Sequence, residues 1–193
     1  MMMKKIVVIG PESTGKSTLC QQLADHYHTK WVPEYAREYL LQHGTQYSFN
    51  DLLTIAKGQL ALEEQFVQQL LPAGANRETK KTQETAKTPP DLLFIDTDQY
   101  VMKVWCEFVF DQCHTWILEQ IACRTYDLYL LCNTDLPWVK DELREYPDME
   151  SRRRLYLIYK DIMINQSVPW VDISGNYDQR LQKAIQAVEK LMG

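Results

Sequence analysis

A glycine-rich segment behind an apolar run constrains the fold of this chain more than any other feature. Residues 10–17 read Gly-Pro-Glu-Ser-Thr-Gly-Lys-Ser and follow the run Ile-Val-Val-Ile of residues 6–9. An apolar strand, a turn with two glycines and a helix start are typical of a phosphate-binding loop. The glycines let the backbone N–H groups converge on a polyphosphate, and the helix adds the positive end of its dipole. The segment therefore predicts a domain that binds a nucleoside triphosphate.

The individual side chains of this segment predict their own tasks. We expect the Lys16 ammonium to reach the β- and γ-phosphates of ATP, and the Ser17 hydroxyl to ligate Mg²⁺. The residues expected to contact the nucleotide are Gly10, Pro11, Glu12, Ser13, Thr14, Gly15, Lys16, Ser17 and Thr18.

Strand and helix patterns alternate along the whole chain, which favours an α/β domain with a parallel sheet covered on both faces. One domain over residues 1–193 is expected, with a polar, Lys- and Thr-rich segment at 73–90 that reads as a mobile insertion loop. We expect strands at 4–9, 29–32, 92–95, 128–132 and 169–173, and helices at 16–28, 35–42, 48–71, 99–110, 115–124, 151–165 and 178–192.

Charge and composition exclude several classes of partner. A net charge of -5 argues against a broad nucleic-acid or anionic-membrane interface, because these need basic surfaces. No apolar run reaches the length of a membrane span. The cysteines number five and form no C-x-x-C pair, which favours a reducing, cytoplasmic compartment. The expected partner is a small molecule.

Two carboxylates follow the apolar run of residues 92–95. Asp96 stands at the end of a buried strand, where nucleotide-binding proteins place a second group that positions the metal, so we expect it to hold Mg²⁺ with Ser17. Asp98 comes two residues later and points to the same side if the chain stays extended. It either contacts an acceptor substrate or caps the helix that starts at residue 99.

Glu34 follows the second expected strand, at the edge of the sheet where ligands collect. We expect its carboxylate to accept the proton of an attacking sugar hydroxyl. The alternative is an exposed residue that the dipole of the next helix stabilises. Arg37 lies one helical turn later and either contacts the substrate or pairs with Glu34.

Residues 140–152 resemble a closing lid between the fourth strand and the next helix. Arginines on such a segment can move onto the phosphates and neutralise charge in the transition state. Arg144 and Arg152 are the candidates, and the alternative for each is a solvated residue paired with nearby carboxylates. Residues 174–177 either approach the adenine base or form a turn before a capped helix. The tryptophans are interpreted as core residues.

Several blocks of the sequence resemble one family. GPESTGKSTL, VPEYAREYL, LLFIDTD and YDLYLLCNTDLPWVKDELR, followed by Arg152, are similar to the ribosylnicotinamide kinase domain of NadR-type proteins. The resemblance spans almost the whole chain in the same order, and residues 73–90 are its main departure.

The resemblance implies a three-layer P-loop nucleoside- and nucleotide-kinase-like fold with a five-stranded parallel sheet. It also implies ATP and Mg²⁺ as the donor and the 5′-hydroxyl of nicotinamide riboside as the acceptor, which gives nicotinamide mononucleotide in NAD salvage. The pyridinium ring of this acceptor is cationic, so we expect Tyr35 or Tyr100 to lie against it beside Glu34 and Asp98.

Three other functions remain open at this point. One is a kinase for another nucleoside or small metabolite, since the specificity of a pocket depends on the placement of its side chains. The second is a P-loop ATPase that acts as a switch on a macromolecule, and the third is a regulatory module that binds nucleotide without turnover.

Overall fold

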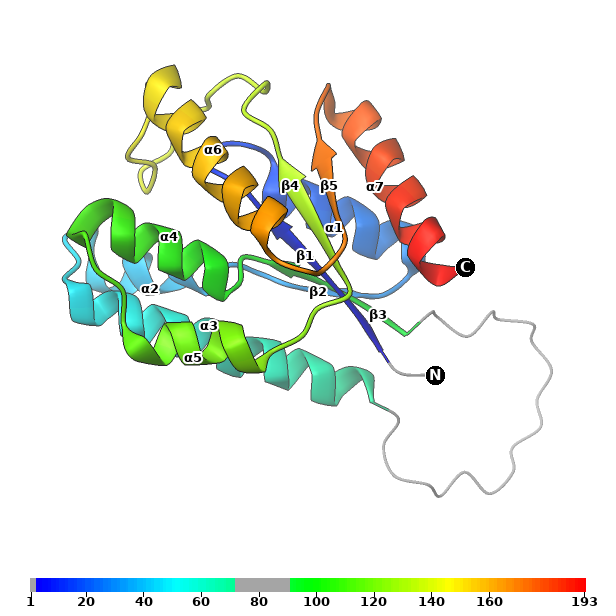
Figure 1. Cartoon of the computed structure of the whole chain (residues 1–193), viewed down its shortest axis with the longest axis horizontal. Helices are drawn as coiled ribbons and strands as arrows, with labels where there is room; N and C mark the ends of the chain where they lie inside the picture. The colour runs from blue at the N-terminus through cyan, green and yellow to red at the C-terminus, as the bar shows by residue number, and fades with distance from the viewer. Residues whose placement is uncertain (1–2, 72–90) are drawn as a thin grey trace.

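The computed structural model of the chain describes residues 3–71 and 91–193 (Figure 1). The expected insertion loop at 73–90 lies outside the described residues. The elements follow one another as β1 (Lys4–Ile9), α1 (Lys16–Tyr27), β2 (Lys30–Val32), α2 (Tyr35–His43), α3 (Phe49–Leu70), β3 (Leu92–Asp96), α4 (Gln99–Phe110), α5 (Thr115–Cys123), β4 (Leu128–Cys132), α6 (Met149–Asn165), β5 (Trp170–Ile173) and α7 (Tyr177–Met192).

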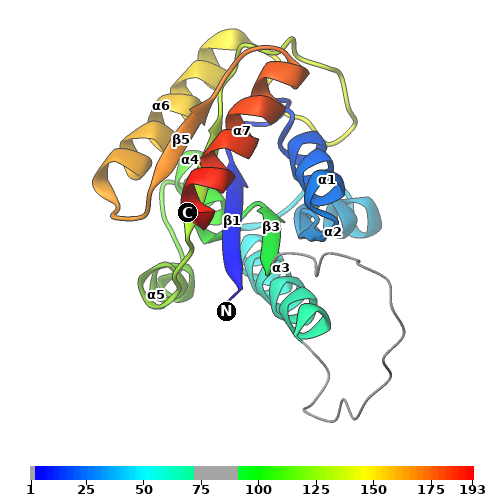
Figure 2. The same ribbon diagram turned by 90° about the vertical axis from the view of Figure 1, so that its right-hand side faces the viewer.

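Five strands in the described part of the chain form one sheet in the order β2-β3-β1-β4-β5, and each pairing is parallel. This confirms the predicted α/β class and the five-stranded parallel sheet. The central strand β1 pairs with β3 on one side, where Val8 stands opposite Asp96, and with β4 on the other. Because the strands are parallel, their carboxyl ends lie at one edge of the sheet (Figure 2).

The sheet is buried on both faces, which explains why its strands read as continuous apolar runs. Successive side chains of β1 point to opposite faces, so Ile6 and Val8 pack with α1 and α7. Val7 and Ile9 pack on the other side with residues of α4 and α6. The result is a helix–sheet–helix arrangement of three layers, as the sequence predicted.

A further apolar cluster joins α2, α3, α4 and α5 beside the α4–α6 layer. The long helix α3 starts with the predicted capping box, in which Ser48 and Asp51 satisfy each other's backbone N–H groups. Helix α6 begins at Met149, two residues before the expected start, because the Asp148 carboxylate accepts from the Ser151 backbone N–H at 2.7 Å. Among the described residues, no helix combines the length and apolar character that a membrane span requires.

Candidate functional site

The phosphate loop is held open by two glycines with positive φ. Gly10 has φ +139°, and a Cβ atom there would lie 2.7 Å from the carbonyl oxygen of Cys132. Gly15 has φ +78° and occupies the N-cap of α1. Only glycine adopts such conformations at little cost, so these two positions let β1 turn directly into α1. The loop thereby presents backbone N–H groups at a helix N-terminus, which is a site for an anion.

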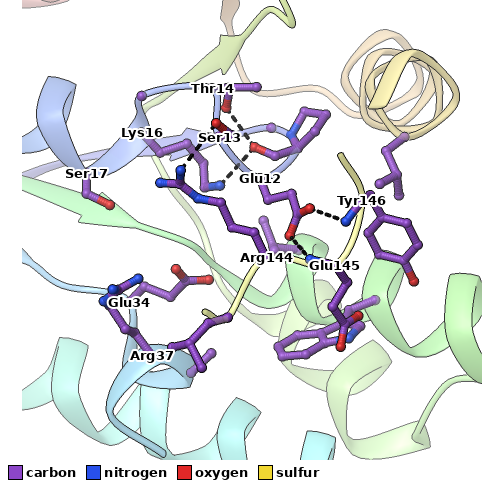
Figure 3. Close-up of a pocket in the computed structure, with 18 of the residues that line it drawn as sticks. Glu12, Ser13, Thr14, Lys16, Ser17, Glu34, Arg37, Arg144, Glu145 and Tyr146 are labelled. Carbon is purple, nitrogen blue, oxygen red and sulfur yellow. Dashed lines mark hydrogen bonds between the residues drawn. The ribbon is translucent and has the colours of Figure 1, made fainter. Parts of the chain in front are cut away.

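The polar side chains of the loop are ordered around its own backbone. The Lys16 ammonium donates to the carbonyl oxygen of Pro11 at 3.1 Å, and the Thr14 hydroxyl donates to the same oxygen at 2.7 Å. Lys16 thus lies over the loop, within the space that a polyphosphate would enter (Figure 3). An ammonium that bonds to a single carbonyl can exchange that bond for phosphate oxygens.

Asp96 and Ser17 meet at the carboxyl edge of the sheet because β3 is the direct neighbour of β1. The Ser17 hydroxyl donates to Oδ2 of Asp96 at 2.5 Å. Burial and, to a smaller extent, the nearby Glu34 carboxylate raise the pKa of Asp96 to about 6, against the lowering effect of Lys16 and of the Ser17 hydrogen bond. The next residue, Thr97, has φ +78°, a strained conformation for a non-glycine residue.

This pair suits Mg²⁺, which prefers oxygen ligands and keeps several from water and phosphate. Within residues 3–71 and 91–193, no group of three or more His, Cys, Asp or Glu side chains forms a ready-made metal site. A cation here would therefore be held by the Ser17 hydroxyl, the Asp96 carboxylate and the oxygens of a bound ligand.

A cavity of about 360 Å³ extends from the phosphate loop towards α2 and α4. Its far part combines aromatic rings with carboxylates, and Figure 3 shows several of these side chains around it. Beyond the loop residues 10–18, the lining comprises Trp31, Pro33, Glu34, Ala36, Arg37, Leu40, Val101, Val104, Trp105, Phe108, Leu143, Arg144, Glu145, Tyr146, Leu155 and Tyr159.

Glu34 lines this cavity, at the N-cap position of α2. As far as the described residues show, its side chain makes no capping hydrogen bond, so the carboxylate is not consumed by the helix end. Arg37 also lines the cavity, but its guanidinium pairs with Asp141 through contacts of 3.0 and 3.2 Å. The expected alternative of an Arg37–Glu34 pair is thus replaced by a bridge to the loop after β4.

Residues 133–148, here called the β4–α6 connection, lie against the phosphate loop. The Glu12 carboxylate accepts from the backbone N–H groups of Glu145, at 3.0 Å, and of Tyr146 (Figure 3). The Ser13 hydroxyl accepts from the Val139 N–H at 2.9 Å and from Arg144 at 3.4 Å. Two consecutive loop residues therefore hold the segment in which we predicted a lid.

The predicted lid boundaries need one correction. Residues 149–152 belong to the first turn of α6, and Arg152 is only 1% exposed. One of its terminal nitrogens donates to the carbonyl oxygens of Ser13 and Leu136, both at 3.2 Å. Arg152 is therefore a fixed support behind the phosphate loop rather than a mobile side chain, whereas Arg144 lines the cavity as expected.

The structure places three of the predicted acceptor residues away from the cavity. Asp98 takes the second of its two predicted roles and caps α4 through the N–H groups of Tyr100 and Val101, while its other oxygen accepts from the Tyr129 hydroxyl at 2.8 Å. Burial raises the pKa of Asp98 to about 6. Tyr100 packs beside Tyr129, and the Tyr35 ring packs against Gly58. We therefore assign none of Tyr35, Asp98 and Tyr100 to contact with the acceptor.

Two tryptophans that the sequence suggested as core residues line the cavity instead, Trp31 and Trp105. The Trp105 indole donates to the Tyr47 hydroxyl at 2.9 Å, and that hydroxyl donates to the Glu145 carboxylate at 2.9 Å. This relay fixes a carboxylate beside an aromatic wall. No sequence motif marks it, because the three residues come from three distant segments.

Arg180, near the start of α7, was also missed. It is 2% exposed, and its guanidinium donates to the carbonyl oxygens of Thr14 (2.9 Å), Asn133 (2.8 Å) and Gly175 (2.8 Å). It also pairs with Asp135. Residues 174–177 form a turn in which Asn176 builds a capping box with Gln179, as in the second of the two readings.

A family model described as an AAA domain matches residues 5–180. Among curated proteins, the trifunctional NAD biosynthesis/regulator protein NadR of Salmonella typhimurium (strain LT2) is 24% identical over 98% of this chain. Its counterpart from Escherichia coli (strain K12) is also 24% identical over 98% of the chain. The chain spans 43% of the length of each of these relatives.

Solved structures agree in fold. A NadR protein crystallised in complex with NR superposes with a TM-score of 0.76 at 23% identity, covering 98% of this chain and 50% of that one. Thymidylate kinase from Candida albicans superposes with a TM-score of 0.62 at 14% identity, covering 98% of this chain and 92% of that one. The fold is therefore the P-loop kinase fold.

Proposed function

The chain belongs to the family described as the AAA domain, and from this membership and the fold we propose that it is an ATP-dependent kinase of nicotinamide riboside. The γ-phosphoryl group of ATP would pass to the 5′-hydroxyl of the riboside, giving nicotinamide mononucleotide and ADP. The observation that carries the proposal is the continuous cavity, which joins the phosphate loop to an aromatic and acidic chamber.

The chamber matches the chemistry of a pyridinium riboside. Glu12, Glu34 and Glu145 line the cavity together with the rings of Trp31 and Trp105. Carboxylates attract a cationic ring, and aromatic faces bind cations through their quadrupole, which contributes about 0.5–2 kcal/mol. A cation–π contact of this kind replaces the one expected from Tyr35 or Tyr100.

The same charges disfavour a phosphorylated acceptor such as a nucleoside monophosphate. A phosphomonoester needs cationic partners on the acceptor side. Arg37, which lies there, is engaged by Asp141 through two contacts, and the nearby Glu34 and Glu145 carboxylates would repel a phosphate. This charge pattern separates the proposal from a thymidylate kinase-like activity, although the folds agree.

In the proposed reaction, Glu34 accepts the proton of the 5′-hydroxyl while the oxygen attacks the γ-phosphorus. The bond from that phosphorus to the bridging oxygen of ADP breaks, and Lys16 stabilises the charge that develops on the phosphoryl oxygens. Ser17 and Asp96 would hold Mg²⁺, which when bound screens the charge of the phosphates. Arg144, at the cavity wall, would contact the same oxygens once a ligand replaces its bonds to the Ser13 hydroxyl and the Val139 carbonyl.

The relatives support the same acceptor. The NadR proteins act in NAD biosynthesis by name, and one solved NadR structure holds NR. They are longer than this chain, so we propose the kinase step alone and not their other activities.

The direct test is to incubate the purified protein with ATP and Mg²⁺ and with one acceptor at a time: nicotinamide riboside, uridine, thymidine or thymidylate. We expect ADP release to depend on nicotinamide riboside and mass spectrometry to identify nicotinamide mononucleotide in equal amount. If the protein phosphorylated only another nucleoside, that nucleoside would replace nicotinamide riboside as the proposed acceptor. ADP release that ignores every small acceptor and responds to a macromolecule would instead support the switch ATPase.

A further inference from the structure

One buried side chain of α3 connects the backbone on either side of Glu34 to the backbone of Asp96. Gln59 is 2% exposed, although it is polar. Its Oε1 accepts from the backbone N–H of Tyr35 at 2.7 Å. Its Nε2 donates to the carbonyl oxygens of Pro33 and Asp96, both at 3.3 Å. Gln59 therefore holds the residues on either side of Glu34 and ties them to the carboxyl end of β3.

The bond to Tyr35 satisfies one of the unpaired N–H groups at the start of α2 from outside the helix. The first N–H groups of a helix have no partner within it, and Asp, Asn, Ser or Thr at the N-cap usually accepts from them. Glu34 occupies the N-cap of α2, yet its side chain makes no such bond in the described part of the structure. Gln59 thus satisfies the N–H of the first helical residue, Tyr35, while the Glu34 carboxylate makes no capping bond and lines the cavity.

The neighbouring residue shows how closely α3 approaches the start of α2. A Cβ atom at Gly58 would lie 2.1 Å from Cε1 of Tyr35, so only glycine fits there. Glycine inside a helix is unfavourable relative to alanine, and here it permits the contact that brings Gln59 within reach of the Tyr35 backbone. Gly58 and Gln59 thus act on the same residue, one through its ring and the other through its amide.

We propose that Gln59 is a positioning residue for phosphoryl transfer: by capping α2 from outside, it fixes the Glu34 carboxylate relative to Asp96. A general base must stay within hydrogen-bond reach of the hydroxyl that it deprotonates, and a shift of about 1 Å costs roughly a hundredfold in rate. The effect on phosphoryl transfer rests on the proposed function. The hydrogen bond from Tyr35 to Gln59 does not depend on it.

The test uses Gln59→Met, which keeps the length of the side chain and removes its hydrogen bonds. Gln99→Met is the matched control, because Gln99 is also buried and its Nε2 donates at 3.0 Å to the carbonyl of Ala56 in α3, a bond that does not involve Glu34 or its neighbours. We expect Gln59→Met to lower kcat about tenfold to a hundredfold at unchanged KM for ATP. Gln99→Met should keep kcat within about twofold. Equal losses of kcat in both variants would overturn the proposal.

Two further measurements separate positioning from general loss of stability. Hydrogen exchange at the Tyr35 amide should accelerate in Gln59→Met and not in Gln99→Met. In a Glu34→Gln background, Gln59→Met should lower kcat no further, because it acts through the carboxylate that is already absent. Independent, multiplicative losses of kcat would show that Gln59 does not act through Glu34.

If Gln59→Met does not fold, Gly58→Ala applies the same test from the other contact. The added methyl displaces the Tyr35 ring, so kcat should fall with KM for ATP unchanged. Full kcat in Gly58→Ala would contradict the positioning role. If the parent protein phosphorylates no acceptor, the proposed function is wrong. If hydrogen exchange at the Tyr35 amide is unchanged in Gln59→Met, the capping role of Gln59 is wrong.

Discussion

The carboxylate of Glu12, inside the phosphate loop, accepts a hydrogen bond of 3.0 Å from the backbone N–H of Glu145, inside the β4–α6 connection. The adjacent Tyr146 N–H donates to the other oxygen of the same carboxylate. A charged acceptor with two backbone donors makes strong hydrogen bonds. The loop that faces the phosphates is therefore also the anchor for the segment that covers the cavity.

Glu12→Ala should release this anchor. We expect hydrogen exchange at the Glu145 and Tyr146 amides to accelerate by about tenfold or more, because hydrogen bonds to a charged group contribute about 1.5–3 kcal/mol. Glu64→Ala is the control, since that carboxylate pairs with Arg124 on the surface at 2.5 Å. Unchanged exchange at both amides would show that other contacts hold the connection.

Lys16→Ala should strongly reduce phosphoryl transfer while the protein stays folded. The ammonium bonds only to the Pro11 carbonyl among the described residues, so its removal costs the fold little. Loss of a donor to the developing charge lowers kcat by about a hundredfold to a thousandfold. Steady-state kinetics with nicotinamide riboside measure this. Lys183→Ala, which removes an ammonium bonded to Ser174 on the surface, should keep the parental rate.

Glu34→Gln tests the general base. The amide keeps the size of the side chain and cannot take the proton, so kcat should fall by about a hundredfold or more while KM for ATP stays the same. Glu38→Gln is the matched control one turn later on α2, where the carboxylate accepts from Gln42 at 3.1 Å. Unimpaired turnover in Glu34→Gln would remove this residue as the base.

Ser17→Ala and Asp96→Asn should both raise the Mg²⁺ concentration that gives half-maximal activity. Their oxygens lie 2.5 Å apart and are the protein ligands that we assign to the cation. A Mg²⁺ titration at fixed ATP measures the shift, and EDTA should stop turnover in the parent. Gln21→Ala, at an exposed position of the same helix, serves as the comparison. If all variants had the same Mg²⁺ dependence, Ser17 and Asp96 would not be the ligands of the cation.

Glu145→Gln should reduce the preference for a cationic acceptor. The relay from Trp105 through Tyr47 fixes this carboxylate beside the aromatic wall, so its charge acts on the ring rather than on the phosphates. We expect kcat/KM for nicotinamide riboside to fall by about threefold to thirtyfold, in line with the energy of such contacts, and kcat/KM for uridine to stay constant. Equal losses of kcat/KM for both nucleosides would show that Glu145 does not recognise the cationic ring and acts only through the β4–α6 connection.

The sequence predicted the parts of this molecule that local patterns encode. The apolar runs gave each strand of the sheet within about two residues, and Ser48 with Asp51 predicted the start of α3. The phosphate loop could be predicted because its two glycines and its lysine lie within one short segment, residues 10–16. Asp96 was predicted to share the cation with Ser17 because nucleotide-binding proteins place a metal-positioning carboxylate at the end of a buried strand, and the two side chains are in contact.

The residues on the acceptor side of the cavity could not be predicted from the sequence in the same way. Asp98 follows Asp96 with the spacing that an extended chain would aim at the ligand, but the chain turns at Thr97, whose φ is +78°. That turn sends the carboxylate to the N-terminus of α4. Trp105 reaches the cavity through a contact with Tyr47, a residue of another segment. Such meetings depend on tertiary packing, which residue spacing along the chain does not report.

The place of Arg180 has a consequence for the far end of the chain. Its guanidinium donates to the carbonyl oxygen of Thr14, so α7, the last helix of the chain, supports the phosphate loop near its beginning. A version of the protein cut after β5 would retain all the residues of the phosphate loop and would leave the carbonyls of Thr14, Asn133 and Gly175 without this donor. The phosphate loop thus depends on a contact from the last helix. Removing that helix should therefore weaken nucleotide binding.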